Sequence, residues 1–274
     1  MTHRIQRLAF LAVVAMTISA CATSPTGRKQ LMLVSEDQAI AESRQAYVAT
    51  VRDYQSKGQL SSDRATVNRV NTITGRLIAQ AIEMRPDSAD WEWSVVVIDE
   101  PEMVNAWCMA GGRMAIYTGL IEKVQPTDDE LAQVMGHEIA HALANHTAEK
   151  MSVQMMSAIG VAAVSIAADN HVAALGGASL AAVYAINRPN SRTAEREADE
   201  IGIELAAKAG YDPAAAPTLW KKMAAVGGQA PPQWMSTHPG PENRQRTLAA
   251  LVPEMQKYYD PDADHPVYRM RSGP

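Results

Sequence analysis

The sequence predicts an α+β fold that is mostly helical and includes a small sheet or hairpin. Long stretches of the 274 residues carry apolar side chains at helical spacing, whereas only a few short stretches have the pattern of strands. The composition, with 47% hydrophobic and 20% charged residues, is that of a globular protein long enough to bury a core. The net charge of −5 gives no basic surface for nucleic acid, so that class of partner is excluded.

The start of the chain has the order of a bacterial export signal. Basic residues at Arg4 and Arg7 precede an apolar stretch, residues 8–20, that is too short to span a bilayer. The stretch ends in Ile-Ser-Ala before Cys21, which resembles the lipobox of bacterial lipoproteins, in which the cysteine is lipidated after cleavage. Ala22 is not the Asp that retains lipoproteins in the inner membrane, so this resemblance implies a Gram-negative outer-membrane lipoprotein facing the periplasm. An ordinary secretory signal with a stray cysteine is the alternative.

Behind the signal, the sequence predicts a tether and two helices. Residues 21–34 contain a proline and a glycine and are expected to form a lipidated tether. Ser35, followed by two acidic residues, predicts the N-cap of a helix that ends near residue 55. Apolar residues at helical spacing predict a second helix over residues 62–84, which ends before a proline.

Two further patterns predict strands. Residues 93–98 contain an uninterrupted β-branched run, which is typical of a buried strand. Residues 105–110 and 113–118 flank a Gly-Gly pair and predict a hairpin, in which Met114 and Ile116 face inward from a strand with one covered face. Such a hairpin could pair with an extended peptide substrate or serve structure alone.

The rest of the chain is predicted to be helical. Thr127 and Glu130 form a capping-box pattern that opens a helix ending near residue 146. The Ala-rich stretch over residues 151–187 is interrupted by polar and glycine residues, and is expected to form a lid, a membrane-facing hairpin or a packed pair of core helices. Further helices are predicted over residues 192–208, 213–226 and 242–257, followed by a loose polar tail over residues 259–274. We therefore predict one domain over residues 35–258.

The clearest chemical pattern lies within the capped helix, where residues 137–141 read His-Glu-Ile-Ala-His. Histidines four residues apart project from one face of a helix, so His137 and His141 can bind a single Zn²⁺. Glu138 lies between them and can take a proton from a bound water. The alternative is a set of polar core residues with other partners. The rest of this helix is nearly free of charge, and buried charge without a partner is costly.

A hydrolytic zinc site usually has three protein ligands and one open position. Thr147 occupies the place where a metzincin has its third histidine, so a distant acidic residue is required. On the helix predicted over residues 192–208, Glu195 falls on the inward face and Asp199 at its edge. We predict that Glu195 is the third ligand and that Asp199 accepts a hydrogen bond from a ligand histidine. Four other charged residues of this helix are assigned to solvent: Arg196, Glu197, Glu200 and Glu204. An entirely exposed acidic helix is the alternative.

Taken together, these motifs resemble the gluzincin family of zinc metallopeptidases that includes the CAAX prenyl protease, HtpX, LoiP and BepA. The segments that carry the resemblance are HEIAH, SRTAEREAD, THPGPENR, GRKQLMLVS and NAWCMAGGRMAIYTGL, and they cover most of the chain behind the signal. The family implies a zincin-type fold and one Zn²⁺ per chain, held by His137, His141 and Glu195, with Glu138 as general base. No helical-repeat pattern like that of BepA is found, so the layout is closest to the LoiP-like outer-membrane lipoprotein peptidases.

The resemblance also implies roles for His238 and Arg244, which keep the six-residue spacing of the family. His238 would lie near the open zinc position and either stabilise the oxyanion or occupy the fourth site as a switch, with Arg244 supporting it. Without the resemblance, a single histidine before a proline is more often a loop residue.

Two functions compete at this point. The leading hypothesis is a zinc endopeptidase, anchored to the outer membrane through Cys21, that hydrolyses misfolded or misassembled envelope proteins as part of periplasmic quality control. The alternative is a chaperone or assembly factor for outer-membrane proteins in which the protease activity is latent or plugged. Both take unfolded envelope polypeptides as partners.

Overall fold

The computed structural model describes residues 21–167, 192–226, 233–238 and 244–270. The signal predicted over residues 1–20 lies outside this part of the chain, and so does the region beyond residue 167 for which a lid, a hairpin or a helical pair is expected. The last four residues of the predicted tail lie outside it as well. Within the described residues, no helix combines the length and the hydropathy needed to cross a bilayer.

Helices form most of the described chain, as predicted. Their bounds are α2 (Glu36–Ser56), α3 (Arg64–Met84), η1 (Pro86–Asp90), α4 (Thr118–Val124), α5 (Asp128–Leu143), α6 (His146–Ala167), α8 (Ala215–Val226), α9 (Gln233–Thr237), α10 (Arg244–Met255) and η2 (Gln256–Tyr258), and residues 192–208 form a further helix. Two predicted caps are confirmed. The Ser35 side chain accepts a hydrogen bond from the Gln38 N–H, and Thr127 and Glu130 form a capping box at the start of α5.

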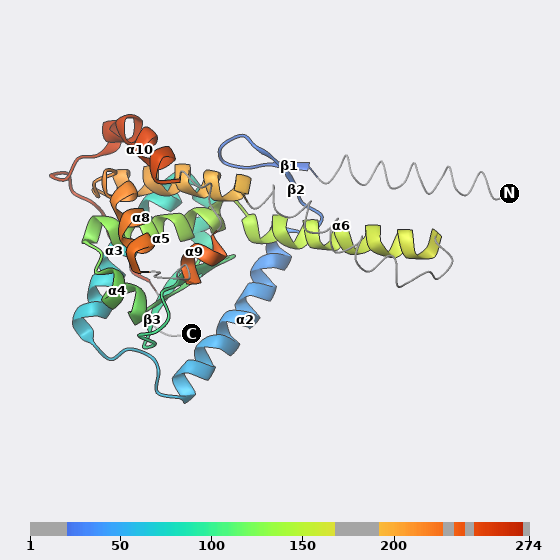
Figure 1. The fold of residues 1–274 in the computed structure, drawn as a ribbon, viewed down its shortest axis with the longest axis horizontal. Coiled ribbons are helices and arrows are strands. Elements are labelled where there is room, and N and C mark those ends of the chain that lie inside the picture. Colours follow the sequence, from blue (N-terminus) through green and yellow to red (C-terminus); the bar gives the residue numbers. More distant parts are fainter. Residues whose placement is uncertain (1–20, 168–191, 227–232, 239–243, 271–274) are drawn as a thin grey trace.

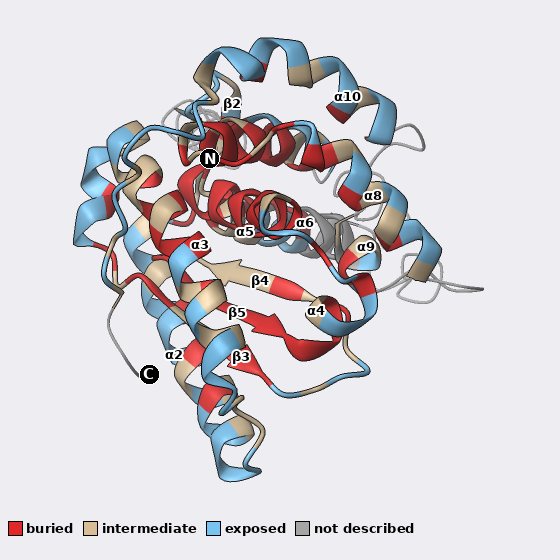
Figure 2. Ribbon diagram, turned by 90° about the vertical axis from the view of Figure 1, so that its left-hand side faces the viewer, coloured by how far each residue is buried: buried red, intermediate tan, exposed pale blue. Residues whose placement is uncertain are grey.

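A three-stranded sheet lies between helices (Figures 1 and 2). The central strand β5 (Arg113–Tyr117) pairs in parallel with β3 (Ser94–Ile98) and antiparallel with β4 (Ala106–Met109). The predicted strand over residues 93–98 and the predicted hairpin are therefore confirmed. β4 is the edge strand on the side of α5 (Figure 2).

The central strand is covered on both faces, whereas the hairpin pattern predicts one covered face. Met114 and Ile116 belong to the main core with residues of α3 and α5, as their predicted inward orientation requires. Ala115 and Tyr117 pack in a second cluster with Tyr54 of α2. The alternation of the strand could not indicate this second layer, because α2 lies far from β5 in the sequence.

α5 ends at Leu143 and not near residue 146 as predicted. Asn145 has a left-handed φ of 54°, and its side-chain amide donates a hydrogen bond to Glu36 over 2.9 Å. α6 then begins at His146 as a separate helix. No glycine or proline marks this break, and its one sequence signal is Asn145, since asparagine tolerates the left-handed conformation at the end of a helix.

The segment over residues 21–34 is not the free tether that its composition predicts. β1 (Cys21–Thr23) pairs antiparallel with β2 (Lys29–Leu31), and this ribbon lies over the start of α6 (Figure 1). The Val34 side chain is buried in a small cluster with Ala148 of α6. The predicted loose tail is exposed over residues 260–264 but is held near its end, where Tyr268 and Met270 pack against the main core and the Tyr268 N–H donates to the Gly75 carbonyl of α3 over 3.0 Å.

Two glycines allow α5 to meet the helix over residues 192–208 at backbone contact. A Cβ on Gly202 would lie 2.8 Å from the backbone nitrogen of His137, and a Cβ on Gly136 would lie 2.8 Å from the Gly202 carbonyl oxygen. This contact between glycines positions the two helices that carry the predicted metal ligands.

We expect Gly202→Ala to destabilise the protein by about 1–3 kcal/mol, because the added methyl group overpacks the crossing of the two helices. At an open helical position the same change would stabilise the protein by about 1 kcal/mol, so the sign of the effect is informative. Urea unfolding measures it. An unchanged or raised free energy of unfolding would show that the helices do not touch at Gly202.

Candidate metal centre

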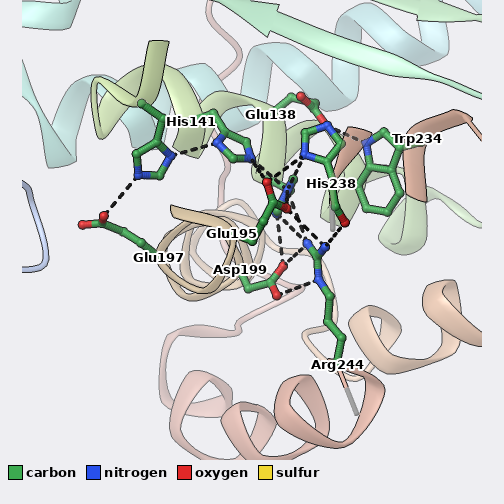
Figure 3. A network of polar contacts seen from close by, with 10 residues as sticks. Glu138, His141, Glu195, Glu197, Asp199, Trp234, His238 and Arg244 are labelled. Carbon is green, nitrogen blue, oxygen red and sulfur yellow. Dashed lines mark hydrogen bonds and ion pairs between the residues drawn. The ribbon is translucent and has the colours of Figure 1, made fainter. Parts of the chain in front are cut away.

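Four side chains that can bind a metal come together beside α5 (Figure 3). His137 and His141 are on α5, Glu195 is on the helix over residues 192–208, and His238 directly follows α9. One ligand atom of each lies within 4.8 Å of the ligand atoms of the others. The structure thus brings together the two histidines and the glutamate predicted as ligands, with His238 beside them, where the family resemblance expects it.

The distances between these atoms fit a tetrahedral zinc ion, whose bonds of about 2.0–2.1 Å separate its ligand atoms by about 3.3 Å. His137 Nε2 lies 3.0 Å from His141 Nε2 and 3.3 Å from Glu195 Oε2. Glu195 Oε1 lies 3.5 Å from His141 Nε2. His238 Nδ1 lies 3.3 Å from both His137 Nε2 and Glu195 Oε1. Imidazole and carboxylate donors in this arrangement are the set that zinc takes in hydrolytic sites.

Glu138 lies beside this cluster and is held by a tryptophan. Its Oε1 accepts a hydrogen bond from Trp234 Nε1 over 2.6 Å and lies 3.3 Å from His238 Nε2 (Figure 3). Both Glu138 and Trp234 are buried. No sequence motif indicates Trp234, and its position four residues before His238 is the one signal that could single it out.

Asp199 and Arg244 form a buried ion pair against the cluster. Arg244 donates to Asp199 through Nε over 2.8 Å and through Nη2 over 2.5 Å, and its Nη1 lies 3.2 Å from Glu195 Oε2. Asp199 Oδ1 lies 3.1 Å from His137 Nδ1, which is the position predicted for it. Arg244 Nη1 also donates to the His238 carbonyl over 3.2 Å, so Arg244 contacts the residue that it is expected to support.

The charges of this network shift the pKa values of its members. Burial would raise the pKa of Glu195, but hydrogen bonds with His137 and His238 outweigh it and hold the pKa far below its ordinary value. Burial and Arg244 act to lower the pKa of His137, but Asp199 and Glu195 raise it to about 9. Burial lowers the pKa of His141 well below 6.5. Since a histidine must be neutral to bind a metal, we expect zinc binding at neutral pH to release a proton from His137.

Glu197 is buried, and its assignment to solvent is therefore wrong. Only 4% of the residue is exposed. Its Oε2 lies 3.1 Å from Nε2 of His146 and accepts a hydrogen bond from Arg28 Nε over 2.6 Å. Burial would raise the pKa of Glu197, but the hydrogen bonds of His146, Ser24, Thr26 and Arg28 outweigh it and lower the pKa to about 2. The other three residues assigned to solvent lie on or near the surface, where Arg196 and Glu200 are exposed and Glu204 is half-buried.

His146 is a second residue beside the cluster that no sequence motif indicates. Its Nδ1 lies 2.8 Å from Nδ1 of His141, on the side of that ring opposite the metal-facing Nε2. The five-residue separation matches no ligand spacing on a helix, and the break before α6 is what brings the two rings together.

Comparison with known proteins agrees with this geometry. A profile of Peptidase family M48 matches residues 64–252. Over 244 residues the chain is 33% identical to "Metalloendopeptidase OMA1, mitochondrial" of Homo sapiens and 32% identical to that of Bos taurus, which covers 85% of this chain and 46% of each relative. Over 207 residues it is 30% identical to the "Beta-barrel assembly-enhancing protease" of Escherichia coli (strain K12), which covers 71% of this chain and 40% of that protein. The chain thus spans about half the length of the curated relatives it matches. The family resemblance of its motifs is confirmed, and the chain belongs to peptidase family M48.

Proposed function

We propose that the protein is a zinc endopeptidase that hydrolyses peptide bonds of misfolded or misassembled polypeptides. The observation that carries the proposal is the approach of His137, His141 and Glu195 to one another, with Glu138 beside them, in a chain of peptidase family M48. Those three side chains would hold the metal. Zinc bound there supplies a lowered pKa for the attacking water and polarisation of the scissile carbonyl.

Glu138 is the general base in this proposal. Its carboxylate takes a proton from the water that attacks the carbonyl carbon, and it later gives the proton to the nitrogen of the leaving amine. The hydrogen bond from Trp234 fixes one carboxylate oxygen and leaves the other for the water. The buried setting excludes bulk water, which strengthens the effect of each charge.

We assign the edge strand β4 to substrate binding. β4 lies next to α5. One edge of β4 pairs with β5. An extended peptide that adds to the outer edge of β4, with which no described strand pairs, gains main-chain hydrogen bonds without strong sequence preference. This mode suits an enzyme that acts on unfolded polypeptides of varied sequence.

The position of His238 favours a second candidate function. Its Nδ1 lies as close to Glu195 and His137 as the predicted ligand atoms lie to one another. As a fourth ligand, His238 would take the place that a water and a substrate carbonyl need. In that state His238 would plug the site, and the alternative function is a chaperone or assembly factor with latent protease activity; in the active peptidase His238 would instead stabilise the oxyanion.

Cleavage of unfolded casein by the purified full chain tests the proposal. We expect cleavage that a zinc chelator abolishes and that added Zn²⁺ restores, since three protein ligands bind the metal reversibly. Binding of casein without cleavage at any zinc concentration would favour the chaperone function. Cleavage that survives complete removal of metal would contradict a zinc peptidase.

We further propose that the protein is an outer-membrane lipoprotein that faces the periplasm and acts on envelope proteins. The lipobox pattern that ends at Cys21 supports the anchor, and the similarity to the Escherichia coli "Beta-barrel assembly-enhancing protease" supports the compartment. The Homo sapiens and Bos taurus relatives are named as mitochondrial, so similarity to this family does not by itself fix the compartment. Cys21→Ser should leave a soluble or uncleaved precursor in cell fractionation, with Cys108→Ser as the control. Unchanged fractionation with the outer membrane would refute the lipid anchor.

A further inference from the structure

A chain of polar contacts leads from the metal-facing side of His141 to the start of the described chain. Nε2 of His141 faces the cluster, 3.0 Å from Nε2 of His137. An imidazole that gives one nitrogen to a metal carries its proton on the other, so Nδ1 of His141 is the donor toward His146 Nδ1. His146 then has its own proton on Nε2, which donates to Glu197 over 3.1 Å. One arrangement of protons thus satisfies every member.

The two ligand histidines are therefore anchored in parallel ways. Nδ1 of His137 meets the carboxylate of Asp199 directly, at 3.1 Å. Nδ1 of His141 meets the carboxylate of Glu197 through the ring of His146. Such outer contacts orient a ligand imidazole, fix its tautomer and raise its basicity.

Four residues near the start of the described chain donate hydrogen bonds to Glu197 or to its neighbour Glu149. We call them the amino-terminal clamp: Ser24, Thr26, Arg28 and Gln30. Arg28 donates through Nε to Glu197 over 2.6 Å and through Nη1 and Nη2 to Glu149 of α6 over 2.7 and 2.6 Å. The hydroxyl groups of Ser24 and Thr26 donate to the other oxygen of Glu197. Gln30 donates to Glu149 and to the Ala144 carbonyl at the break between α5 and α6.

The charge balance of this region depends on Arg28. Glu149 and Glu197 are both buried, with 4% of each residue exposed, and the guanidinium lies between them. Without Arg28, both buried carboxylates would lose the guanidinium that pairs with them, and Glu197 would lose a hydrogen bond to the oxygen that contacts His146.

The backbone break before His146 belongs to the same arrangement. On a continuous helix, residues five apart point about 140° away from each other, so His146 could not face His141. The left-handed conformation of Asn145 ends α5 and turns the ring of His146 toward His141. Conformations of this kind in residues other than glycine persist where the surrounding structure holds them.

We propose that His146, Glu197 and the amino-terminal clamp form a positioning device for the metal ligand His141, so that the segment directly behind Cys21 controls the affinity of the zinc site. The inference rests on the proposed zinc-peptidase function and adds a second control on its metal centre. His146 acts through His141 and touches neither the metal nor the substrate. The amino-terminal clamp directly follows Cys21, the residue that would carry the lipid anchor.

Zinc affinity of the full chain, measured by competition with a chelator, tests the device. We expect His146→Leu to weaken zinc binding about 10–100-fold, because His141 loses its anchor. His146→Gln should recover most of the affinity, since its amide can accept from His141 and donate to Glu197. Arg28→Met should weaken zinc binding in the same direction, and Lys29→Met, which changes an exposed neighbour, should not. The visible absorption of the Co²⁺-substituted protein should change in His146→Leu and Arg28→Met alone.

Several outcomes would overturn the proposal. His146→Leu with wild-type zinc affinity and an unchanged cobalt spectrum would show that the contact is structural. If His146→Leu does not fold, Arg28→Met decides: a lower unfolding temperature with unchanged zinc affinity would count against the device. His146→Gln as weak as His146→Leu would show that packing, and not hydrogen bonding, matters. A wild-type chain that binds no zinc would contradict the proposed function and this inference together. Zinc-dependent cleavage by the wild type, with unchanged zinc affinity in His146→Leu and Arg28→Met, would contradict this inference alone.

Discussion

Glu138→Gln is expected to abolish turnover while the metal site keeps its zinc. General-base catalysis contributes about 10²–10⁴-fold to a rate, so cleavage should fall by at least that range. The amide of Gln can still accept the hydrogen bond of Trp234 Nε1, so the local packing should persist. His137, His141 and Glu195 are untouched by the change, and zinc content and thermal stability should stay close to wild type. Casein cleavage and metal analysis of one preparation measure both quantities.

Glu122→Gln is a matched control, because Glu122 is exposed on α4. It should leave both cleavage and zinc content unchanged. A Glu138→Gln protein that loses its zinc would identify Glu138 as a ligand or a structural residue. One that keeps zinc and full activity would place the catalytic base elsewhere.

Glu195→Gln should have the largest effect on metal binding. Among the described residues, Glu195 is the one carboxylate in the cluster of possible ligands, and a neutral amide is a much weaker ligand for zinc. The loss of affinity should exceed the roughly 10–100-fold that follows from losing an outer hydrogen-bond partner. Arg244 keeps its pairing with Asp199, so the zinc-free variant should still fold. Chelator competition gives the affinity, and circular dichroism checks the fold.

Glu200→Gln on the same helix is the control, since Glu200 is exposed. The zinc affinity of Glu197→Gln should lie between those of Glu195→Gln and Glu200→Gln, because the buried Glu197 acts on His141 only through His146. A Glu195→Gln protein that retains stoichiometric zinc would remove Glu195 from the ligand set.

The parts of the fold that the sequence predicts are those with local signals. Ser35 and the capping box at Thr127 mark where α2 and α5 begin, and the Gly-Gly pair marks the turn between β4 and β5. The break between α5 and α6 carries only the weaker signal of an asparagine, Asn145, at the end of a helix. The packing of residues 21–34 and of Tyr268 depends on surfaces that exist only after the helices have assembled.

In the candidate site, too, the sequence predicts what depends on local spacing and not what depends on tertiary packing. Helical spacing alone places His137 and His141 on one face, and it places Glu195 and Asp199 toward the core. A helical projection shows one inward face, toward α5, and cannot show that Arg28 covers the flank that carries Glu197. These two residues are 169 positions apart in the sequence, so only the tertiary structure reveals their ion pair.

X-ray absorption at the zinc edge of the zinc-loaded full chain tests the metal centre most directly. We expect one zinc per chain with nitrogen and oxygen neighbours at about 2.0–2.1 Å and no sulfur neighbour, as binding by His137, His141 and Glu195 requires. The described chain carries a free thiol at Cys108 of the edge strand β4, within the same region of the fold. A sulfur neighbour at about 2.3 Å, or a chain that takes up no stoichiometric zinc, would contradict the proposed metal centre.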